Sequence, residues 1–227
     1  MAFRPRLKIC AVTTAADARL VSESGADYCG VLVNVGFSER SLSLEQAREV
    51  AAACSIPVVA LVCDAGAAAV EEIDRRIAPY AVQLLGRESP DYVRALRPRL
   101  RCRIWKALHH PPAPGQARPE EYVEAGVDAF VMDTCDASEG FLRLGGTGKT
   151  GDWDRAAELV RGCGIPVFLA GGIGAENLAG ALAKVRPYGL DLCSSVESCK
   201  GKKDPEKVRR LVEAFRTAVA AIEERER

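Results

Sequence analysis

Eight short apolar segments recur along the chain, and longer amphipathic segments separate them. The apolar segments are rich in Val, Ile, Leu and Cys, which is typical of parallel strands that are buried on both faces. We therefore expect eight strands, each followed by a helix or a near-helical stretch. The expected strands cover residues 7–12, 27–33, 57–62, 80–85, 102–108, 128–133, 166–170 and 190–195.

The segments between the expected strands carry helix signals. Apolar residues repeat at a spacing of three to four over residues 204–222, so one face of that helix is apolar. Asp152 and Asp204 stand at the N-cap position of helical segments, and Gly25 stands at a C-cap position. The proline-rich stretch after His110 predicts only a short helix, at 119–125.

This alternation predicts an α/β fold, a single (β/α)8 TIM barrel that spans residues 1–227. A doubly wound open sheet is the competing architecture. It usually has fewer strands and a G-x-G-x-x-G turn after the first one, and no such turn follows residues 8–12. The barrel is therefore the expected fold.

Composition narrows the classes of function. The chain has 31 basic and 31 acidic residues, whereas a nucleic-acid-binding protein carries a clustered basic face. No stretch of about 18 apolar residues predicts a membrane span, and the N-terminus lacks the apolar core of a signal peptide. The nine cysteines include no C-x-x-C pair, which favours free thiols in a reducing cytoplasm.

The chemistry of such a barrel is expected at the carboxyl ends of its strands. Cys10 ends the first expected strand and Asp133 ends the sixth, and Trp105 and Lys106 are expected in the wall of the same site. A thiol and a carboxylate that flank one ligand suit general acid–base catalysis, in which one group gives a proton and the other takes one. For Asp133, an N-cap or another loop hydrogen bond is an equally good interpretation.

Two neighbouring strand ends carry the features of a phosphate site. Gly171 and Gly172 come between the seventh strand and a helix, where backbone N–H groups can turn toward an anion. Ser194 and Ser195 end the eighth strand and add hydroxyl groups. Phosphate sites in such barrels commonly use these two loops, whereas a tight turn is the simpler explanation of the glycines.

Two further motifs are less specific. Segment 145–150 ends in Gly-Lys-Thr, but position 143 is Arg where a nucleotide-binding loop needs glycine. It is better explained as a loop that folds over a ligand, with Lys149 as a surface lysine or an anion contact. His109 and His110 have no carboxylate or thiol at ligand spacing, so a surface pair in a proline-rich loop is favoured over a metal site.

Together these segments resemble the phosphoribosylanthranilate isomerase family. The resemblance rests on LKICAVTTAADA, GADYCGVLV, AVQLLGRES, FVMDT, GGTGKTGDW, LAGGIGAENL and LDLCSSVESCKGKKDPEKV, which follow the family's order over nearly the whole chain. The family has a TIM-barrel fold and acts in tryptophan biosynthesis. It rearranges N-(5′-phosphoribosyl)anthranilate to 1-(2-carboxyphenylamino)-1-deoxyribulose 5-phosphate, an Amadori rearrangement, without a metal or a cofactor.

The resemblance implies a role for each matching residue. Cys10 falls on the general base that removes the C2′ proton of the sugar, and Asp133 falls on the general acid that protonates the ring oxygen. Arg40 falls on the arginine that pairs with the anthranilate carboxylate, and Asp191 falls on the aspartate of strand 8. The phosphate-binding positions fall on Gly171, Gly172, Ser194 and Ser195.

Four positions near the expected site depart from the family pattern. Ala11 replaces a glycine beside the base, and Leu85 replaces a histidine on the fourth strand. Gly151 replaces an aromatic residue of the glycine-rich loop, and Ser195 replaces a glycine of the phosphate site. Two alternatives therefore stay open: an isomerase acting on another phosphorylated amino-sugar or N-glycoside, and a non-catalytic barrel that binds a sugar phosphate. Retention of both the acid and the base speaks against the second.

These expectations define the ligand and the setting of the protein. We expect a small phosphorylated sugar as substrate, and no nucleic acid or membrane as partner. The chain is expected to act in the cytoplasm, as a monomer or a homodimer. No metal and no cofactor are expected in the site.

Overall fold

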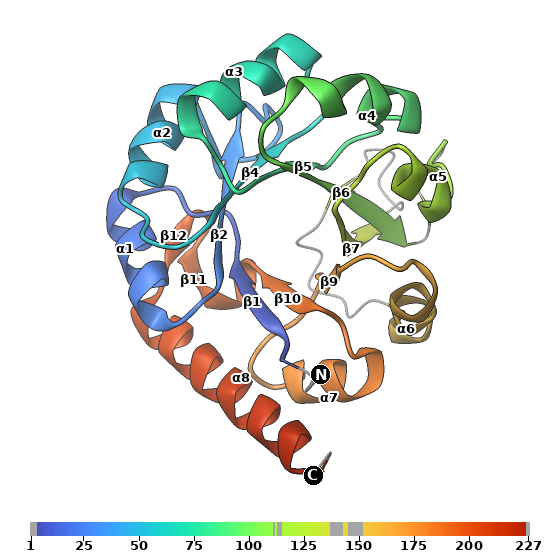
Figure 1. Cartoon of the computed structure of the whole chain (residues 1–227). Helices are drawn as coiled ribbons and strands as arrows, with labels where there is room; N and C mark the ends of the chain where they lie inside the picture. The colour runs from blue at the N-terminus through green and yellow to red at the C-terminus, as the bar shows by residue number, and fades with distance from the viewer. Residues whose placement is uncertain (1–3, 111, 113–114, 137–142, 145–151, 226–227) are drawn as a thin grey trace.

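The computed structural model describes residues 4–110, 112, 115–136, 143–144 and 152–225. Within these residues, eight parallel strands follow one another around a barrel, and the last pairs with the first to close it. Figure 1 looks along the barrel, with the strands at the centre and the helices in a ring around them. This arrangement confirms the predicted eight-stranded α/β barrel.

The barrel strands lie close to the predicted segments. In chain order they are β1 (Arg6–Ile9), β2 (Tyr28–Val33), β4 (Val58–Val62), β5 (Ala81–Leu84), β6 (Arg103–His110), β7 (Ala129–Asp136), β9 (Val167–Leu169) and β10 (Gly189–Leu192). Short strands accompany them in the described chain: β3 (Ser41–Leu42), β8 (Arg143–Leu144), β11 (Glu197–Cys199) and β12 (Lys202–Lys203). Of these, β11 and β12 form an antiparallel hairpin after β10.

Helices connect the strands, as the sequence predicts. They are α1 (Ala15–Ser24), α2 (Leu44–Ala52), α3 (Ala67–Ile77), α4 (Pro90–Leu96), α5 (Pro119–Glu124), α6 (Trp153–Gly162), α7 (Leu178–Val185) and α8 (Pro205–Arg225), with 3-10 turns η1 (Arg97–Arg99) and η2 (Ser194–Val196). None of the helices in the described residues is long and apolar enough to cross a membrane.

The predicted caps explain where several helices begin and end. The carboxylate of Asp152 accepts hydrogen bonds from the first N–H groups of α6, and the carboxylate of Asp204 does the same for α8. Gly25 ends α1 with a φ of 99°, in the left-handed region that favours glycine. The short helix α5 confirms the prediction made for the proline-rich segment.

Two predicted strands extend too far, and the structure gives the reason for each. The first stops at Ile9 because Ala11 has a φ of 59°, a left-handed conformation that no strand contains. The eighth stops at Leu192, and Ser194 and Ser195 belong to the 3-10 turn η2 instead.

Apolar side chains fill the amino-terminal part of the barrel interior. Trp105 stacks on Phe168 with ring centroids 4.6 Å apart, and Tyr28 meets Trp105 edge-on at 5.3 Å. Trp105 therefore belongs to this internal cluster, and its expected place in the wall of the ligand site is wrong. Because the cluster fills this end of the barrel, a ligand cavity has room only at the carboxyl ends of the strands.

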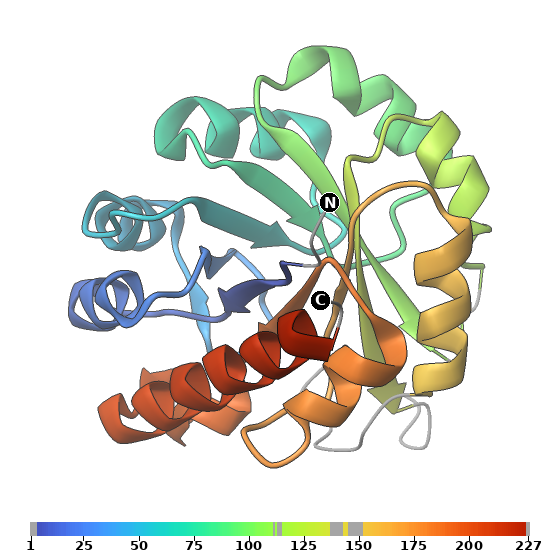
Figure 2. The ribbon, with the colours of Figure 1, turned by 60° about the horizontal axis from the view of Figure 1, so that its bottom comes forward.

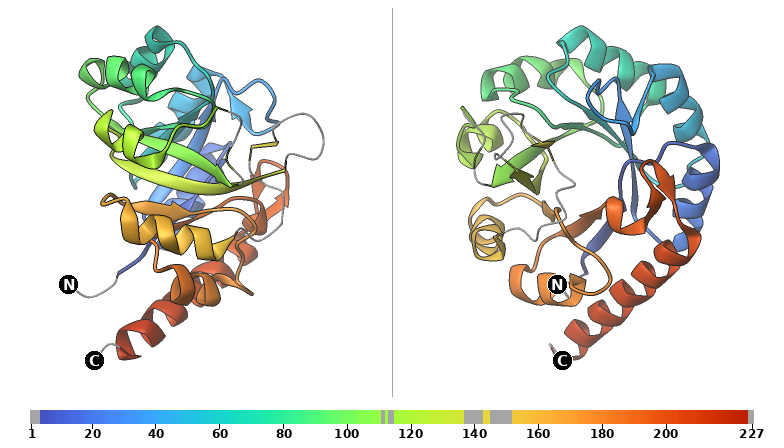
Figure 3. Two further views of the ribbon diagram at one scale, coloured as in Figure 1. Left: turned by 90° about the vertical axis from the view of Figure 1, so that its right-hand side faces the viewer. Right: turned by 180° about the vertical axis from the view of Figure 1, so that it is seen from behind.

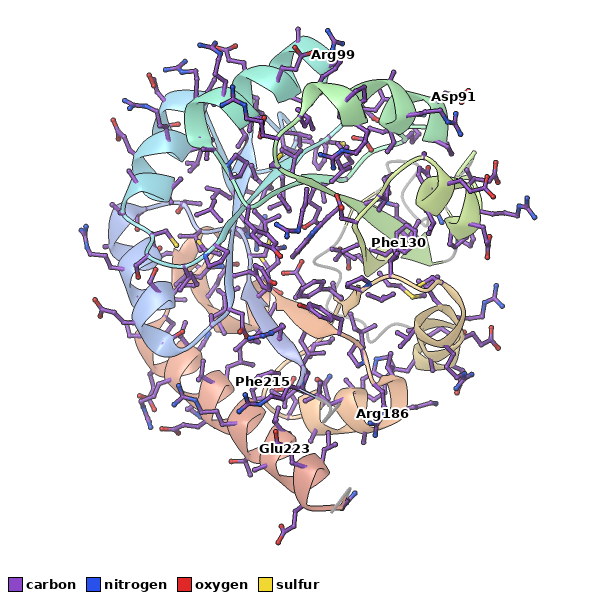
Figure 4. All side chains as sticks on the ribbon, viewed as in Figure 1. Asp91, Arg99, Phe130, Arg186, Phe215 and Glu223 are labelled. Atoms are coloured by element: carbon purple, nitrogen blue, oxygen red, sulfur yellow. The ribbon has the colours of Figure 1, made fainter. Side chains whose placement is uncertain are left out.

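A second apolar layer lies between the strands and the helix ring. In α8 this layer includes Leu211 and Phe215, which confirms the predicted apolar face. Figure 4 shows side chains on both sides of the strands, with Asp91 and Arg99 at the outer rim of the ring. In Figure 2, α8 runs beside α7 along the outside of the barrel.

Both ends of the chain lie on one side of the barrel. Figure 3 shows this from the side, and Arg4 and Glu223 form an ion pair there at 3.6 Å. Because β1 begins at that side and β10 runs parallel to it, the carboxyl ends of the barrel strands face the opposite side. The functional site is built at that opposite side.

Candidate active site

A cavity of about 140 Å³ lies at the carboxyl ends of the barrel strands. The predicted site residues converge on it from β1, β2, β7, β9 and β10 or from the loops that follow them. Those that line it are Cys10, Arg40, Asp133, Gly171, Gly172, Asp191 and Ser194. Ser195 does not line the cavity; it is exposed in the turn η2.

Cys10 follows β1, and its buried side chain lines the cavity. The thiol stands over Gly30 of β2, where the missing side chain leaves room for it. Burial raises the pKa of the Cys10 thiol above its usual value, and the nearby positive charges of Lys8 and Lys203 oppose that shift. The site therefore holds a thiol whose conversion to thiolate depends on neighbouring ammonium groups.

One lining residue, Asp191, belongs to a buried ion pair. Lys8 Nζ donates to Asp191 Oδ2 at 2.6 Å, and the lysine is fully buried. Burial alone would lower the pKa of Lys8, but the charge and the hydrogen bond of Asp191 outweigh it and raise that pKa. Both side chains come from paired positions of β1 and β10. This lysine lies inside an apolar strand segment, and no sequence pattern identifies it as part of the site.

Arg40 enters the cavity from the segment before β3, and Glu197 holds it in place. Arg40 donates from Nε to Oε1 of Glu197 at 2.9 Å and from Nη2 to Oε2 at 2.6 Å. Such a two-point contact uses one edge of the planar guanidinium. Within the described residues Nη1 of Arg40 has no hydrogen-bond partner, so the other edge is available to a ligand.

The same glutamate joins a second cation to the site. Lys203 Nζ lies 3.3 Å from Oε1 of Glu197 and is fully buried, and the backbone N–H of Gly201 donates to the same oxygen at 3.2 Å. Arg40, Lys203 and Glu197 together carry a net charge of +1 beside the cavity. This surplus favours an anionic ligand. Sequence reasoning missed Glu197, although it stands in the CSSVES segment already chosen for its serines.

The glycine turn after β9 has the conformation expected of a tight turn next to a helix. Gly171 and Gly172 have φ angles of 83° and 62°. Asn177 bridges the turn, since its Nδ2 donates to the carbonyl of Gly172 at 2.9 Å and its Oδ1 accepts from Gly174 N–H at 2.9 Å. The turn lines the cavity beside Ser194, and α7 begins six residues after Gly172. The backbone N–H groups of such a turn can bind an anion.

Asp133 is half-buried in the cavity wall. It does not end its strand as predicted, because β7 continues to Asp136, where it pairs with β8. Leu85, which follows β5, lines the same cavity and presents an apolar surface to it. The backbone of Asp133 pairs with that of His109 on β6, but the His109 ring turns to the carbonyl of Leu85, with Nε2 at 3.1 Å. His109 is buried, so its expected place in a surface pair is wrong. Burial lowers the pKa of His109.

Lys106 also lies elsewhere than expected. It is buried on the outer side of β6, where Nζ donates to the carbonyl of Gly86 at 2.8 Å and pairs with Glu88 at 3.2 Å. Lys106 therefore ties the ends of β5 and β6 together and is not part of the cavity wall. Glu88 in turn accepts the N–H of Asp64 at 2.8 Å, so this cluster fixes two loops at the mouth.

The glycine-rich segment 145–150, with Lys149, and the following Gly151 lie outside the described residues, as does the side chain of His110. No cluster of three or more potential metal ligands is present among the residues that are described.

Residues 7–214 match the family model described as N-(5′phosphoribosyl)anthranilate (PRA) isomerase. A protein of Methanocella arvoryzae named N-(5′-phosphoribosyl)anthranilate isomerase is 36% identical over 214 residues, which cover 93% of this chain and 98% of that protein. A protein of the same name from Methanopyrus kandleri is 38% identical over 226 residues, 93% of this chain and 99% of its own.

Solved structures agree with this match. Phosphoribosyl anthranilate isomerase from Thermotoga maritima superposes with a TM-score of 0.80 at 27% identity, covering 94% of this chain and 100% of that chain. The enzyme of that name from Thermus thermophilus gives a TM-score of 0.75 at 31% identity, covering 93% of this chain and 98% of its own. The barrel and its connections are therefore shared with these proteins over nearly their whole length.

Proposed function

This chain belongs to the N-(5′-phosphoribosyl)anthranilate isomerase family, and we propose that it catalyses the Amadori rearrangement of N-(5′-phosphoribosyl)anthranilate in tryptophan biosynthesis. The substrate carries a phosphate at one end and a carboxylate at the other. The observation that carries the proposal is the orientation of Arg40, whose free edge meets the same cavity as Cys10 and the glycine turn. One cavity thus offers a cationic contact, an anion-binding turn and a thiol.

The reaction needs one acid and one base. Asp133, as the acid, gives a proton to the ring oxygen, so that the sugar ring opens and the C1′–N bond becomes a protonated Schiff base. Cys10, as the base, removes the proton from C2′, and the electron pair of that C–H bond forms the enolamine. A proton then adds to C1′ and the 2′-hydroxyl loses its proton, which gives the ketone at C2′. The positive charges of Lys8 and Lys203 near Cys10 favour the thiolate that this role requires.

Binding is assigned to the remaining residues of the cavity. We place the phosphate at Gly171, Gly172 and Ser194, with Ser195 at the edge of that site. Arg40 pairs with the carboxylate of the anthranilate ring. Asp191 lines the same cavity, and its Oδ1 is buried without a hydrogen-bond partner in the described chain, so it can accept from a sugar hydroxyl.

Rescue of a tryptophan auxotroph that lacks this isomerase tests the proposal. The wild-type chain should restore growth without tryptophan, and the purified protein should abolish anthranilate-type fluorescence as the substrate is consumed. A Cys10→Ser variant of equal expression and thermal stability serves as the control and should fail in both assays. Tight binding of phosphate without any turnover would instead favour a non-catalytic barrel.

One observation favours a second candidate function. Leu85 gives the cavity an apolar wall where the family pattern has a histidine, and this suits a related isomerase acting on another phosphorylated amino-sugar or N-glycoside. Slow turnover of phosphoribosylanthranilate beside fast turnover of such a compound would support it. In either case we propose a cytoplasmic enzyme, and a monomer or a homodimer remains the prediction for its assembly.

A further inference from the structure

A polar side chain stands deep in the barrel among apolar neighbours. Gln83 is on β5, and its backbone pairs with that of Leu61 on β4 and that of Trp105 on β6. The side chain is only 2% exposed, yet it lines the cavity. It therefore belongs to the wall of the ligand site, above the aromatic cluster that fills the rest of the barrel.

The carbonyl oxygen of this side chain is not used by the protein. Oε1 of Gln83 is buried and has no hydrogen-bond partner within the described residues. Burying an amide oxygen without a partner costs about 1–3 kcal/mol, whereas Met or Leu would fill the same space without that cost. Packing alone therefore does not account for a glutamine at this position.

A second unused acceptor faces the cavity from the other wall. Oδ1 of Asp191 on β10 is also buried without a partner in the part of the chain described, while its Oδ2 is held by Lys8. Three barrel strands separate β5 from β10 in either direction around the barrel, so the two residues stand on opposite walls. Each of these oxygens can only accept a hydrogen bond, and a ligand between them must supply donors.

We propose that Gln83 accepts a hydrogen bond from a hydroxyl group of the sugar part of the ligand. A phosphate dianion and a carboxylate have no hydrogen to donate, and the glycine turn and Arg40 already account for them. The hydroxyl-bearing carbons lie between these two charged ends. Gln83 is thus a specificity-determining residue that recognises a hydroxylated chain. The inference rests on the proposed function only in taking the ligand to be a phosphorylated sugar.

Two matched substitutions test this role. Gln83→Met removes the amide and keeps the volume. Gln46→Met makes the same chemical change in α2, where Oε1 of Gln46 does accept a hydrogen bond, from Ser43 N–H at 2.9 Å. Calorimetry then compares the binding of ribose 5-phosphate and of inorganic phosphate to both variants and to wild type, and a thermal melt without ligand gives each Tm.

The expected result separates ligand binding from structure. Gln83→Met should lower the affinity for ribose 5-phosphate about 3- to 10-fold, as expected for the loss of one neutral hydrogen bond. Its affinity for inorganic phosphate should stay unchanged. Its Tm should stay equal or rise because an unpaired buried oxygen is gone. Gln46→Met should lower Tm by about 1–4 °C through the lost cap and change neither affinity.

Two results would overturn the inference. One is unchanged affinity of Gln83→Met for ribose 5-phosphate. The other is a lower Tm together with an equal loss of affinity for both ligands. That pattern would mean that Gln83 stabilises the fold and does not bind the sugar. Neither measurement needs turnover, so a failure of the proposed isomerase activity in the growth assay remains distinguishable from a failure of this inference.

Discussion

The thiol of Cys10 and the backbone of Gly30 are in such close contact that position 30 has no room for a side chain. A Cβ built at Gly30 would stand 2.7 Å from Sγ of Cys10 and 3.0 Å from its Cα. The thiol could rotate away, but the Cα belongs to the chain that leaves β1 and cannot move without shifting that backbone. The thiol of Cys10 can therefore occupy its position only if residue 30 on the neighbouring strand β2 is a glycine.

This contact predicts that Gly30→Ala damages the site. We expect a loss of about 1–3 kcal/mol in the free energy of unfolding, as for overpacking of a core, together with reduced kcat. Gly36→Ala is the matched control, since nothing lies within 4 Å of a Cβ built at Gly36, and it should leave both quantities unchanged. Urea unfolding and steady-state assays on the two variants make the comparison. Equal behaviour of the two would contradict the steric argument.

The backbone conformation of Ala11, next to the thiol, predicts that replacing it with glycine stabilises the protein. Its φ of 59° is in the left-handed region, which costs an alanine about 1 kcal/mol relative to glycine. Ala11→Gly should therefore raise Tm by about 2–4 °C. Ala53→Gly, at a C-cap with a φ of −85°, should not raise it. If both variants melted at lower temperature than wild type, strain at Ala11 would not be the explanation.

The barrel could be predicted because the sequence patterns that indicate its strands and helices each span only a few neighbouring residues. Each strand that is buried on both faces is a short apolar run, and several helices begin at a capping residue, so residues a few positions apart identify them. The strand ends were less predictable. The conformation of Ala11 shortens the first strand, and the turn η2 replaces the end of the last. The apolar residues of these two segments do not indicate where the strand ends.

The polar framework of the site could not be predicted for a different reason. Lys8 and its partner Asp191 are 183 residues apart, and Arg40 and Glu197 are 157 residues apart. Only closure of the barrel brings these strands together. A lysine inside an apolar segment, or a glutamate after a serine pair, therefore gives no local sign of its partner. The positions of Cys10 and Asp133 at strand ends indicated an acid–base pair, while the role of each and the arginine came from resemblance. The structure adds the groups that hold Cys10 and Arg40.

The proposed acid and base predict a sharp loss of turnover. Cys10→Ser should lower kcat by orders of magnitude, because a serine hydroxyl ionises far less readily than a thiol near neutral pH and so supplies almost none of the anionic base. Asp133→Asn should be comparably damaging, since an amide has no proton of suitable acidity to give. Circular dichroism and phosphate titration should show that both variants remain folded and bind phosphate. Turnover close to wild type in the serine variant would rule out Cys10 as the base.

The opposite pKa shifts of two thiols predict that their alkylation by iodoacetamide depends differently on pH. Burial raises the pKa of Cys10, so without ligand the unreactive thiol form persists beyond neutral pH, and the alkylation rate should climb as pH increases from 7 to 9. Hydrogen bonds from Cys29 and Ser22 lower the pKa of Cys54 to about 6, so its rate should be nearly flat above pH 7. Peptide mass spectrometry separates the two sites. Equal rates at pH 7 would contradict the burial argument for Cys10.

The two-point contact between Arg40 and Glu197 predicts how the substrate carboxylate is recognised. A charge-assisted contact of this kind contributes roughly 1.5–3 kcal/mol. Arg40→Ala should accordingly raise KM for phosphoribosylanthranilate about 10- to 100-fold, with phosphate affinity unchanged. Glu197→Gln should raise KM less, because the arginine remains but loses its charged partner. Arg48→Ala, which removes an exposed arginine paired with Glu45 at 3.3 Å, is the control and should leave KM as it is. If Arg40→Ala hardly changed a slow residual rate, the true substrate would lack this carboxylate, as expected of an isomerase for another phosphorylated amino-sugar.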